Sequence, residues 1–154
     1  MTKQQKYTEL IKRIICLIEG ETDEISVMST IACELFHTFD TFDWVGFYRV
    51  TEPQMLKVGP YQGTHGCLQI PFSTGVCGKC AAEKATLIVD DVNQIPYHIA
   101  CSSSTKSEIV VPIFDGKGGL RAVLDVDSDM IKNFDTIDKT NLEAICALIS
   151  PVYK

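Results

Sequence analysis

The sequence predicts an α+β domain with a central, mostly antiparallel sheet, terminal helices on one face and long loops on the other. Near both ends of the chain, apolar residues recur at three- and four-residue steps, which is helical spacing. Between these ends lie runs rich in β-branched and aromatic residues, joined by turns that favour hairpins and therefore antiparallel pairing. With 154 residues the chain has the length of one domain, which we expect to cover 1–154.

Two helices are expected at the start of the chain. Apolar residues from Tyr7 to Ile18 predict an amphipathic helix that ends near Gly20, and a second stripe predicts a helix from about Ser26 to Phe39. Cys16 and Cys33 lie within these helices, and we interpret both as small core residues.

Strands are expected through the rest of the chain, with one helix between them and one after them. Period-two alternation in the first strand puts Trp44 and Tyr48 on the same face. Ser73 or Thr74 is suited to cap the central helix, and 90–106 is expected to be irregular. The predicted strands are Trp44–Val50, Met55–Tyr61, Thr86–Val89, Glu108–Phe114 and Leu120–Asp127, and the predicted helices are Thr74–Lys84 and Ile137–Val152.

Composition excludes several classes of protein. The formal net charge of -6 argues against a nucleic-acid surface, which needs clustered Lys and Arg. We find no apolar leader and no run of the roughly 20 residues that span a bilayer, so we expect no membrane partner and a cytoplasmic protein. Seven cysteines in a reducing compartment predict thiol chemistry or metal binding rather than a disulfide framework.

The stretch from Gly59 to Glu108 is where we expect the functional loops. Glycine and proline punctuate it densely, and it holds four of the seven cysteines. Long loops inside a compact domain are usually functional.

Three carboxylates are the first candidates for chemistry. Asp125 and Asp127 stand at i and i+2 of a strand, so both lie on one face, and Glu108 begins the preceding strand. Carboxylates that share a pocket repel one another, which raises the pKa of at least one and lets it act as a general acid. They can also hold an ammonium group. The alternative is a solvated outer face of an amphipathic strand.

The loop cysteines allow more than one interpretation. Cys77-x2-Cys80 followed by His98-x2-Cys101 has a spacing that can bind zinc. Cys77 and Cys80 can also be a thioredoxin-type redox pair, although the strand expected before such a pair is missing. For Cys80 we favour a small residue on a helix face. His65 and His98 lie beside loop cysteines and can lower a thiol pKa.

Several short motifs follow one another along the chain. They are Gly59-Pro-Tyr-Gln-Gly63, Cys67-Leu-Gln-Ile-Pro-Phe72, Gly75-Val-Cys77-Gly78, His98-Ile-Ala-Cys101, Ser107-Glu108-Ile-Val-Val-Pro112 and Leu124-Asp125-Val-Asp127-Ser128. In this order they resemble the motifs of the free methionine-R-sulfoxide reductases, which are single GAF domains. The resemblance extends from about Asp43 to the last helix and implies a GAF-like fold.

The resemblance also implies roles for the cysteines. Cys101 would attack the sulfoxide sulfur and become a sulfenic acid, and Cys67 would then form a disulfide with it. Cys77 would be an alternative or secondary resolving thiol, and thioredoxin would return the enzyme to the dithiol state. Cys80 departs from the family pattern, which leaves a disulfide with Cys77 as an alternative.

The same resemblance implies which residues form the substrate pocket. Glu108, Asp125 and Asp127 match the family's acidic triplet, which would protonate the sulfoxide oxygen and hold the substrate ammonium group. Trp44 and Tyr48 match the aromatic wall against the sulfoxide methyl group, with two core aromatics as the alternative. It implies free methionine sulfoxide as substrate, no bound cofactor or metal, and a homodimer. Other classes remain open: a non-catalytic GAF sensor of a small molecule or of redox state, or a structural zinc protein.

Overall fold

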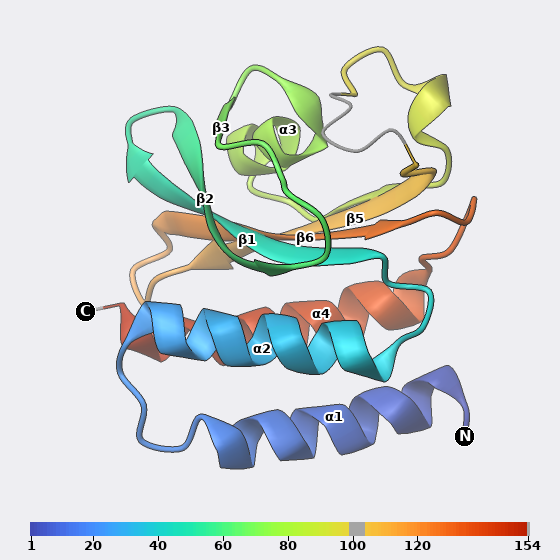
Figure 1. The fold of residues 1–154 in the computed structure, drawn as a ribbon. Helices are drawn as coiled ribbons and strands as arrows, with labels where there is room; N and C mark the ends of the chain where they lie inside the picture. Colours follow the sequence, from blue (N-terminus) through green and yellow to red (C-terminus); the bar gives the residue numbers. More distant parts are fainter. Residues whose placement is uncertain (99–103, 154) are drawn as a thin grey trace.

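The computed structural model describes residues 1–98 and 104–153. Its elements are α1 (Lys3–Leu17), α2 (Glu24–Thr38), β1 (Trp44–Glu52), β2 (Met55–Gln62), β3 (Gln69–Pro71), α3 (Gly75–Glu83), β4 (Leu87–Val89), the 3-10 turn η1 (Val92–Gln94), β5 (Ser107–Phe114), β6 (Leu120–Ser128), α4 (Thr136–Ala147) and the 3-10 turn η2 (Ser150–Val152). Figure 1 shows them in layers: α1 lies outside α2 and α4, which cover one face of the sheet, and α3 with its surrounding loops covers the other.

The sheet has six strands in the order β3-β2-β1-β6-β5-β4, and each described pair of neighbours is antiparallel. The predicted architecture is therefore confirmed. Strand β3 was not predicted, because three residues are too few to display an alternating pattern. It forms because Leu56 in β2 pairs with Ile70, and both side chains are buried.

Alternation along the strands divides the buried residues between two cores. In β1, Val45 and Phe47 belong to a core on the side of the helices α1, α2 and α4. Trp44 and Tyr48 belong to a second core, on the side of α3 and the loops, as the period of two predicts. We call these the helix-side core and the loop-side core.

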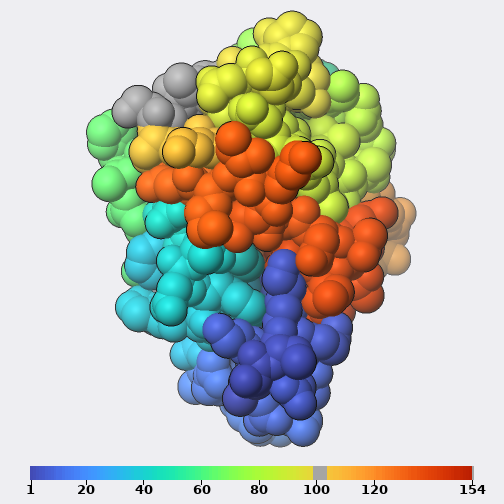
Figure 2. All heavy atoms as spheres, turned by 90° about the vertical axis from the view of Figure 1, so that its right-hand side faces the viewer, coloured from blue at the N-terminus to red at the C-terminus, as the bar shows by residue number. Residues whose placement is uncertain are grey.

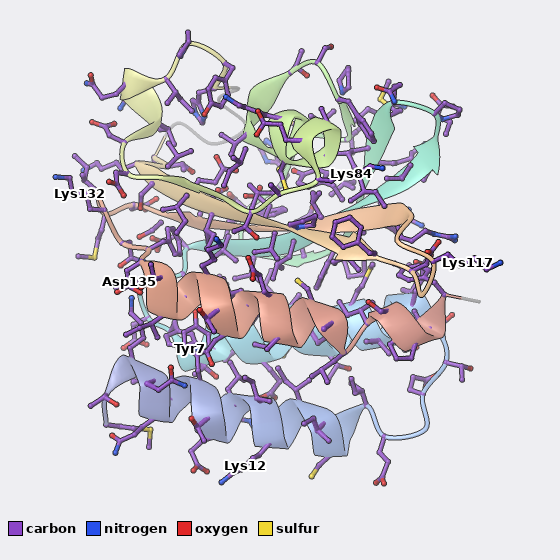
Figure 3. All side chains as sticks on the ribbon, turned by 180° about the vertical axis from the view of Figure 1, so that it is seen from behind. Tyr7, Lys12, Lys84, Lys117, Lys132 and Asp135 are labelled. Atoms are coloured by element: carbon purple, nitrogen blue, oxygen red, sulfur yellow. The ribbon has the colours of Figure 1, made fainter. Side chains whose placement is uncertain are left out.

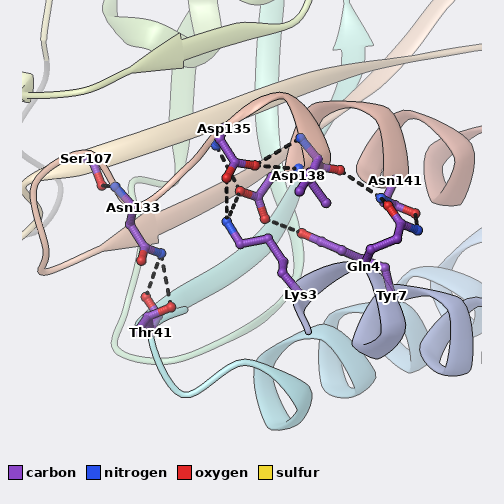
Figure 4. A network of polar contacts seen from close by, with 10 residues as sticks. Lys3, Gln4, Tyr7, Thr41, Ser107, Asn133, Asp135, Asp138 and Asn141 are labelled. Atoms are coloured by element: carbon purple, nitrogen blue, oxygen red, sulfur yellow. Dashed lines mark hydrogen bonds and ion pairs between the residues drawn. The ribbon is translucent and has the colours of Figure 1, made fainter. Parts of the chain in front are cut away.

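Helix α1 is attached to α4 by polar side chains as well as by apolar packing. Tyr7 is fully buried between α1 and the helices next to the sheet, whereas Lys12 points away on the outer side of α1 (Figure 3). The Tyr7 hydroxyl donates a hydrogen bond to Oδ1 of Asp138 in α4, and Nζ of Lys3 contacts Oδ2 of the same carboxylate, both at 2.7 Å (Figure 4). The N-terminal helix is thereby fixed to the last helix of the chain.

The passage from β6 to α4 is held by side chains from distant segments. Figure 2 faces this side of the molecule, where the passage, in orange-red, lies between the first residues, in blue, and the segment around β4 and η1, in yellow-green. The Ser107 hydroxyl donates to the backbone oxygen of Met130, and the side-chain amide of Asn133 donates to the Thr41 hydroxyl at 3.1 Å. These bonds attach the passage to the start of β5 and to the segment before β1.

Local predictions differ from the structure at three places. The last helix ends at Ala147, and the chain turns into η2; in a continued α-helix Pro151 would have no N–H to donate to the carbonyl of Ala147, and its ring would clash with that carbonyl. Thr74 occupies the N-cap position of α3, but its hydroxyl donates to the oxygen of Pro71 at 3.1 Å and makes no capping hydrogen bond. Cys16 is exposed and Cys33 is half-buried, so neither is a core residue.

No helix within residues 1–98 and 104–153 combines the length and the apolar character needed to cross a membrane.

Candidate functional site

The three predicted carboxylates lie together on the loop-side face of the sheet. Glu108 in β5 stands opposite Asp127 in β6, and Asp125 stands two residues earlier in β6. Leu124 and Val126 point the other way, into the helix-side core. Glu108 and Asp125 are buried, with 6% and 5% exposure, so the alternative of a solvated strand face does not hold.

These carboxylates form one wall of a small cavity of about 30 Å³. That volume holds about one or two water molecules, so the walls must separate before an amino acid can enter. Of the predicted site residues, Tyr48, Cys77 and the three carboxylates line the cavity. The lining residues are Tyr48, Ile70, Gly75, Val76, Cys77, His98, Thr105, Glu108, Asp125 and Asp127.

Burial and mutual repulsion shift the protonation of the carboxylates. Burial raises the pKa of Glu108, and the negative charge of Asp125 raises it further. The pKa of Asp125 is raised by burial and then by Asp127, and that of Asp127 by burial and then by Glu108. Oδ1 of Asp125 and Oδ1 of Asp127 are buried without a hydrogen-bond partner. The site therefore favours protons, or a cation that replaces them.

Cys77 brings a thiol to the same cavity from the first turn of α3. Its sulfur, an oxygen of Glu108 and an oxygen of Asp125 all lie within 4.8 Å of one another. Burial raises the pKa of Cys77, and the charge of Asp125 raises it further, so the protonated thiol is favoured.

A thiolate with two carboxylates is also a donor set that zinc accepts. Neither Cys80 nor His98, which the zinc interpretation of the sequence requires, belongs to this cluster in the described part of the chain. The Cys80 thiol is buried and donates to the backbone oxygen of Val110 at 3.6 Å, which confirms it as a residue on the helix face. Cys77 and Cys80 both carry free thiols, so they do not form the alternative disulfide.

Trp44 ties the loop after β2 to the sheet. Its indole N–H donates to the backbone oxygen of Thr64 at 2.7 Å, and its ring stacks between Tyr61 and Tyr48 at centroid distances of 5.2 and 5.8 Å. The neighbouring Gly46 is required by this stack, because a Cβ there would lie 2.4 Å from Cη2 of Trp44. Trp44 therefore supports the cavity wall through Tyr48 and is not among the described lining residues.

The described cysteines differ in redox state. Cys67, on the loop that Trp44 holds, is half-buried and disulfide-bonded. The free cysteines in the described residues are Cys16, Cys33, Cys77, Cys80 and Cys146. Cys101, the predicted nucleophile, lies outside the described residues, so its contacts and its pairing stay predictions.

Several lining residues were not predicted from the sequence. Ile70 lies on the unrecognised strand β3, and Thr105 lies in the segment expected to be irregular. His98 was considered only as a zinc ligand or as a neighbour of a cysteine. It lines the cavity, and burial lowers its pKa, which favours the neutral imidazole.

Comparison with known proteins identifies the family. Residues 23–151 match the GAF domain family. The chain is 41% identical to GAF domain-containing protein A of Dictyostelium discoideum, over 96% of this chain and 92% of that protein. It is 36% identical to the free methionine-R-sulfoxide reductase of Saccharomyces cerevisiae, over 97% of this chain and 87% of that protein. The X-ray structure of the Neisseria meningitidis free methionine-R-sulfoxide reductase in complex with its substrate superposes with a TM-score of 0.94 and 38% identity, over 99% of this chain and 91% of that chain. The cavity wall of buried carboxylates is thus built on a chain that belongs to the GAF domain family and, within it, to the free methionine-R-sulfoxide reductases.

Proposed function

We propose that this protein reduces the R sulfoxide of free methionine to methionine, with a cysteine as nucleophile and thioredoxin as reductant. The observation that carries this proposal is the group of three carboxylates around one small cavity: Glu108 and Asp125 are buried, and Asp125 and the half-buried Asp127 each have an unpartnered oxygen. A free amino acid has an ammonium group that can neutralise them, and a peptide-bound methionine lacks it. The yeast and Neisseria relatives, which carry the same activity in their names, support the sulfoxide as substrate.

The carboxylates have two tasks in this proposal. The sulfoxide oxygen must be protonated during reduction, and a carboxylic acid with a raised pKa can donate that proton near neutral pH. The raised pKa values of Glu108, Asp125 and Asp127 support this role. The carboxylates that are not donating a proton hold the substrate ammonium group.

Cys101 is the nucleophile in this mechanism. Described residues before and after it in the sequence, His98 and Thr105, line the cavity, which supports its access to the substrate. The Cys101 thiolate attacks the sulfoxide sulfur, and the oxygen is transferred to Cys101 with a proton from the acids. Methionine leaves as the reduced thioether, and Cys101 is oxidised by two electrons to a sulfenic acid.

Cys67 resolves the sulfenic acid. Its thiol attacks the Cys101 sulfur, an S–S bond forms and water leaves. The disulfide-bonded state of Cys67 supports a resolving role for this residue. Cys77 is the alternative resolving thiol, but burial beside two carboxylates raises its pKa and disfavours the thiolate that such an attack needs.

The test is a coupled assay on free methionine R-sulfoxide, with dithiothreitol or thioredoxin as reductant. We expect Cys101→Ser to have no measurable activity and Cys67→Ser to release one methionine per chain without thioredoxin-driven turnover. We expect Cys77→Ser to lose less than tenfold in turnover. Activity of Cys101→Ser equal to that of the parent protein would contradict the proposal and favour a non-catalytic sensor.

Two further properties belong to this proposal. The free thiols among the described residues suit a reducing compartment such as the cytoplasm. The family relationship supports a homodimer, which sedimentation of the purified protein would test.

A further inference from the structure

We propose that the cavity is also an inhibitory zinc site, in which Cys77, Glu108 and Asp125 bind Zn²⁺ and the bound ion excludes free methionine sulfoxide. The ion is a reversible competitor of the substrate and not a resident cofactor. The exclusion rests on the proposed function, because it requires that the same carboxylates hold the substrate ammonium group. The metal site itself rests only on the geometry of the cavity.

The three donor side chains come from two layers of the fold. Helix α3, which carries Cys77, packs against β5 and β6 on the loop side of the sheet (Figure 1), and these strands carry Glu108 and Asp125. The sulfur and one oxygen of each carboxylate lie within 4.8 Å of one another. A tetrahedral zinc site holds such donor atoms about 3.5 Å apart, so the side chains need to approach by only about 1 Å.

Oxygen atoms in the cavity lack a partner that a cation would supply. Asp125 has 5% exposure, yet among the described residues its Oδ1 has no hydrogen-bond partner. The same holds for Oδ1 of Asp127, which lines the same cavity. A buried carboxylate without compensation is costly. The cavity volume of about 30 Å³ suits one ion with a bound water better than an amino acid.

The donor set selects zinc over the commoner divalent cations. Mg²⁺ and Ca²⁺ prefer sites built of oxygen atoms, and a sulfur ligand disfavours both. Zn²⁺ accepts a thiolate together with carboxylates, and three protein ligands leave its fourth position for water. Cys77 has 4% exposure and a free thiol, so no disulfide competes for its sulfur.

The protonated state of Cys77 does not oppose this binding. Burial and the charge of Asp125 raise the pKa of Cys77, which favours the thiol while no cation stands beside the carboxylates. A divalent ion carries a larger charge than either carboxylate, and a thiol that coordinates it loses its proton. Zinc binding therefore releases protons from the cavity to solvent.

Metal titrations of matched variants test the site. Co²⁺ can replace Zn²⁺, and a thiolate that binds it gives a sulfur-to-metal charge-transfer absorption, which the parent should show and excess Zn²⁺ should remove. Cys77→Ser should lose this absorption and bind Zn²⁺ at least about 100-fold more weakly, because loss of an outer partner alone costs about 10–100-fold. Cys80→Ser is the control, since Cys80 is buried one turn further along α3 and a serine hydroxyl there can still donate to Val110. It should bind both ions as the parent does.

A second variant removes an oxygen ligand. Asp125→Asn should bind Zn²⁺ at least about tenfold more weakly. The variant should stay folded, because its amide can donate hydrogen bonds to the remaining carboxylates. Equal zinc affinity of the parent, Cys77→Ser and Asp125→Asn would overturn the metal site. Equal affinity of the parent for Mg²⁺ and Zn²⁺ would do the same.

Competition tests the exclusion. In Cys101→Ser, which should bind the substrate without turnover, free methionine sulfoxide at ten times its own Kd should raise the apparent Kd for Zn²⁺ about tenfold. A chelator buffer fixes the concentration of free Zn²⁺. N-acetylmethionine sulfoxide, which lacks the ammonium group, should leave the Kd unchanged. An unchanged Kd with the free amino acid would overturn the exclusion.

The metal site and the proposed function fail separately. Zinc binding that depends on Cys77, in a parent protein without reductase activity, would keep the metal site and remove the proposed function. Reductase activity in a parent whose zinc binding does not depend on Cys77 would keep the proposed function and remove the metal site.

Discussion

Carboxylates with buried oxygens occur on both sides of the sheet, and they differ in whether those oxygens have hydrogen-bond partners. On the helix side, Asp138 is fully buried and saturated with partners: the Tyr7 hydroxyl, the Lys3 ammonium group and the backbone N–H of Asp135, at 2.7, 2.7 and 2.9 Å. On the loop side, Asp125 and Asp127 each keep an oxygen without a partner. The first carboxylate joins two helices, and the second group is left for a ligand.

The pKa shifts around the two sites fit this contrast. Burial alone would lower the pKa of Lys3, but the hydrogen bond and charge of Asp138 raise it, so the ion pair is favoured in the folded state. The carboxylates of the cavity repel one another, and each has a raised pKa. A buried charge without compensation destabilises a fold. The cavity therefore keeps a stability defect that a substrate cation would relieve.

The largest effect is expected when the charge of Asp125 is removed. We expect Asp125→Asn to lower kcat/KM for free methionine sulfoxide by about 10²–10⁴, the range for loss of a general acid or base. The free energy of unfolding at pH 7 should rise by about 1 kcal/mol, because an amide can donate hydrogen bonds to the remaining carboxylates. The coupled assay and urea unfolding measure the two quantities. Loss of stability together with activity would contradict the functional interpretation of this carboxylate.

An Asp→Asn substitution on the helix side, at Asp138, should lower stability and leave activity nearly unchanged. We expect Asp138→Asn to lower the free energy of unfolding by about 2–3 kcal/mol, because Lys3 and Tyr7 lose a charged partner. The midpoint of thermal unfolding should fall by roughly 5–10 °C. The kcat/KM should change less than twofold below that transition. A drop in activity without a drop in stability would show that the helix side takes part in the reaction.

A smaller effect is expected from the hydroxyl of Tyr7. Tyr7→Phe removes one hydrogen bond to Asp138, and a bond to a charged group contributes about 1.5 kcal/mol at the lower end of its range. In a double-mutant cycle, Tyr7→Phe and Asp138→Asn should be non-additive by about 1 kcal/mol, since the first removes the donor of this hydrogen bond and the second removes the charge of its acceptor. Additive values from urea unfolding would contradict the contact.

The contrast between the two sites also explains what the sequence could predict. The alternation of side chains along a strand was enough to predict that Glu108, Asp125 and Asp127 lie together, because it depends only on neighbouring residues and on the pairing of consecutive strands. Asp138 gave no such signal: it occupies the third position of a helix, where a capping carboxylate is ordinary, and its partners Lys3 and Tyr7 are 135 and 131 positions away. The bond from Trp44 to Thr64 was missed for a similar reason, since a side chain that reaches a loop backbone leaves no periodic pattern.

The smallest and most discriminating effect concerns pH. For Glu108, Asp125 and Asp127, the folded-state pKa is raised, so the folded chain binds protons more tightly than the unfolded chain. Their contribution to stability is therefore complete at low pH and is lost as the pH rises above the unfolded-state values of 3.8 and 4.5.

On the helix side the sign is reversed at Asp135. Burial alone would raise its pKa, but the hydrogen bonds from the backbone of Asp138 and from Lys3 lower it. Its stabilising contribution is present above pH 3.8 and is lost as the pH falls below that value. Urea unfolding of the parent and of Asp125→Asn at pH 5 and pH 7 isolates the cavity acids, because Asp135 stays charged at both values and His98, whose lowered pKa makes stability rise with pH, is present in both proteins. Between these values the parent should lose more stability than Asp125→Asn, which has one carboxylate fewer to ionise. Equal losses would mean that the cavity acids are already ionised at pH 5, and a neutral carboxylic acid could then not protonate the sulfoxide oxygen at neutral pH.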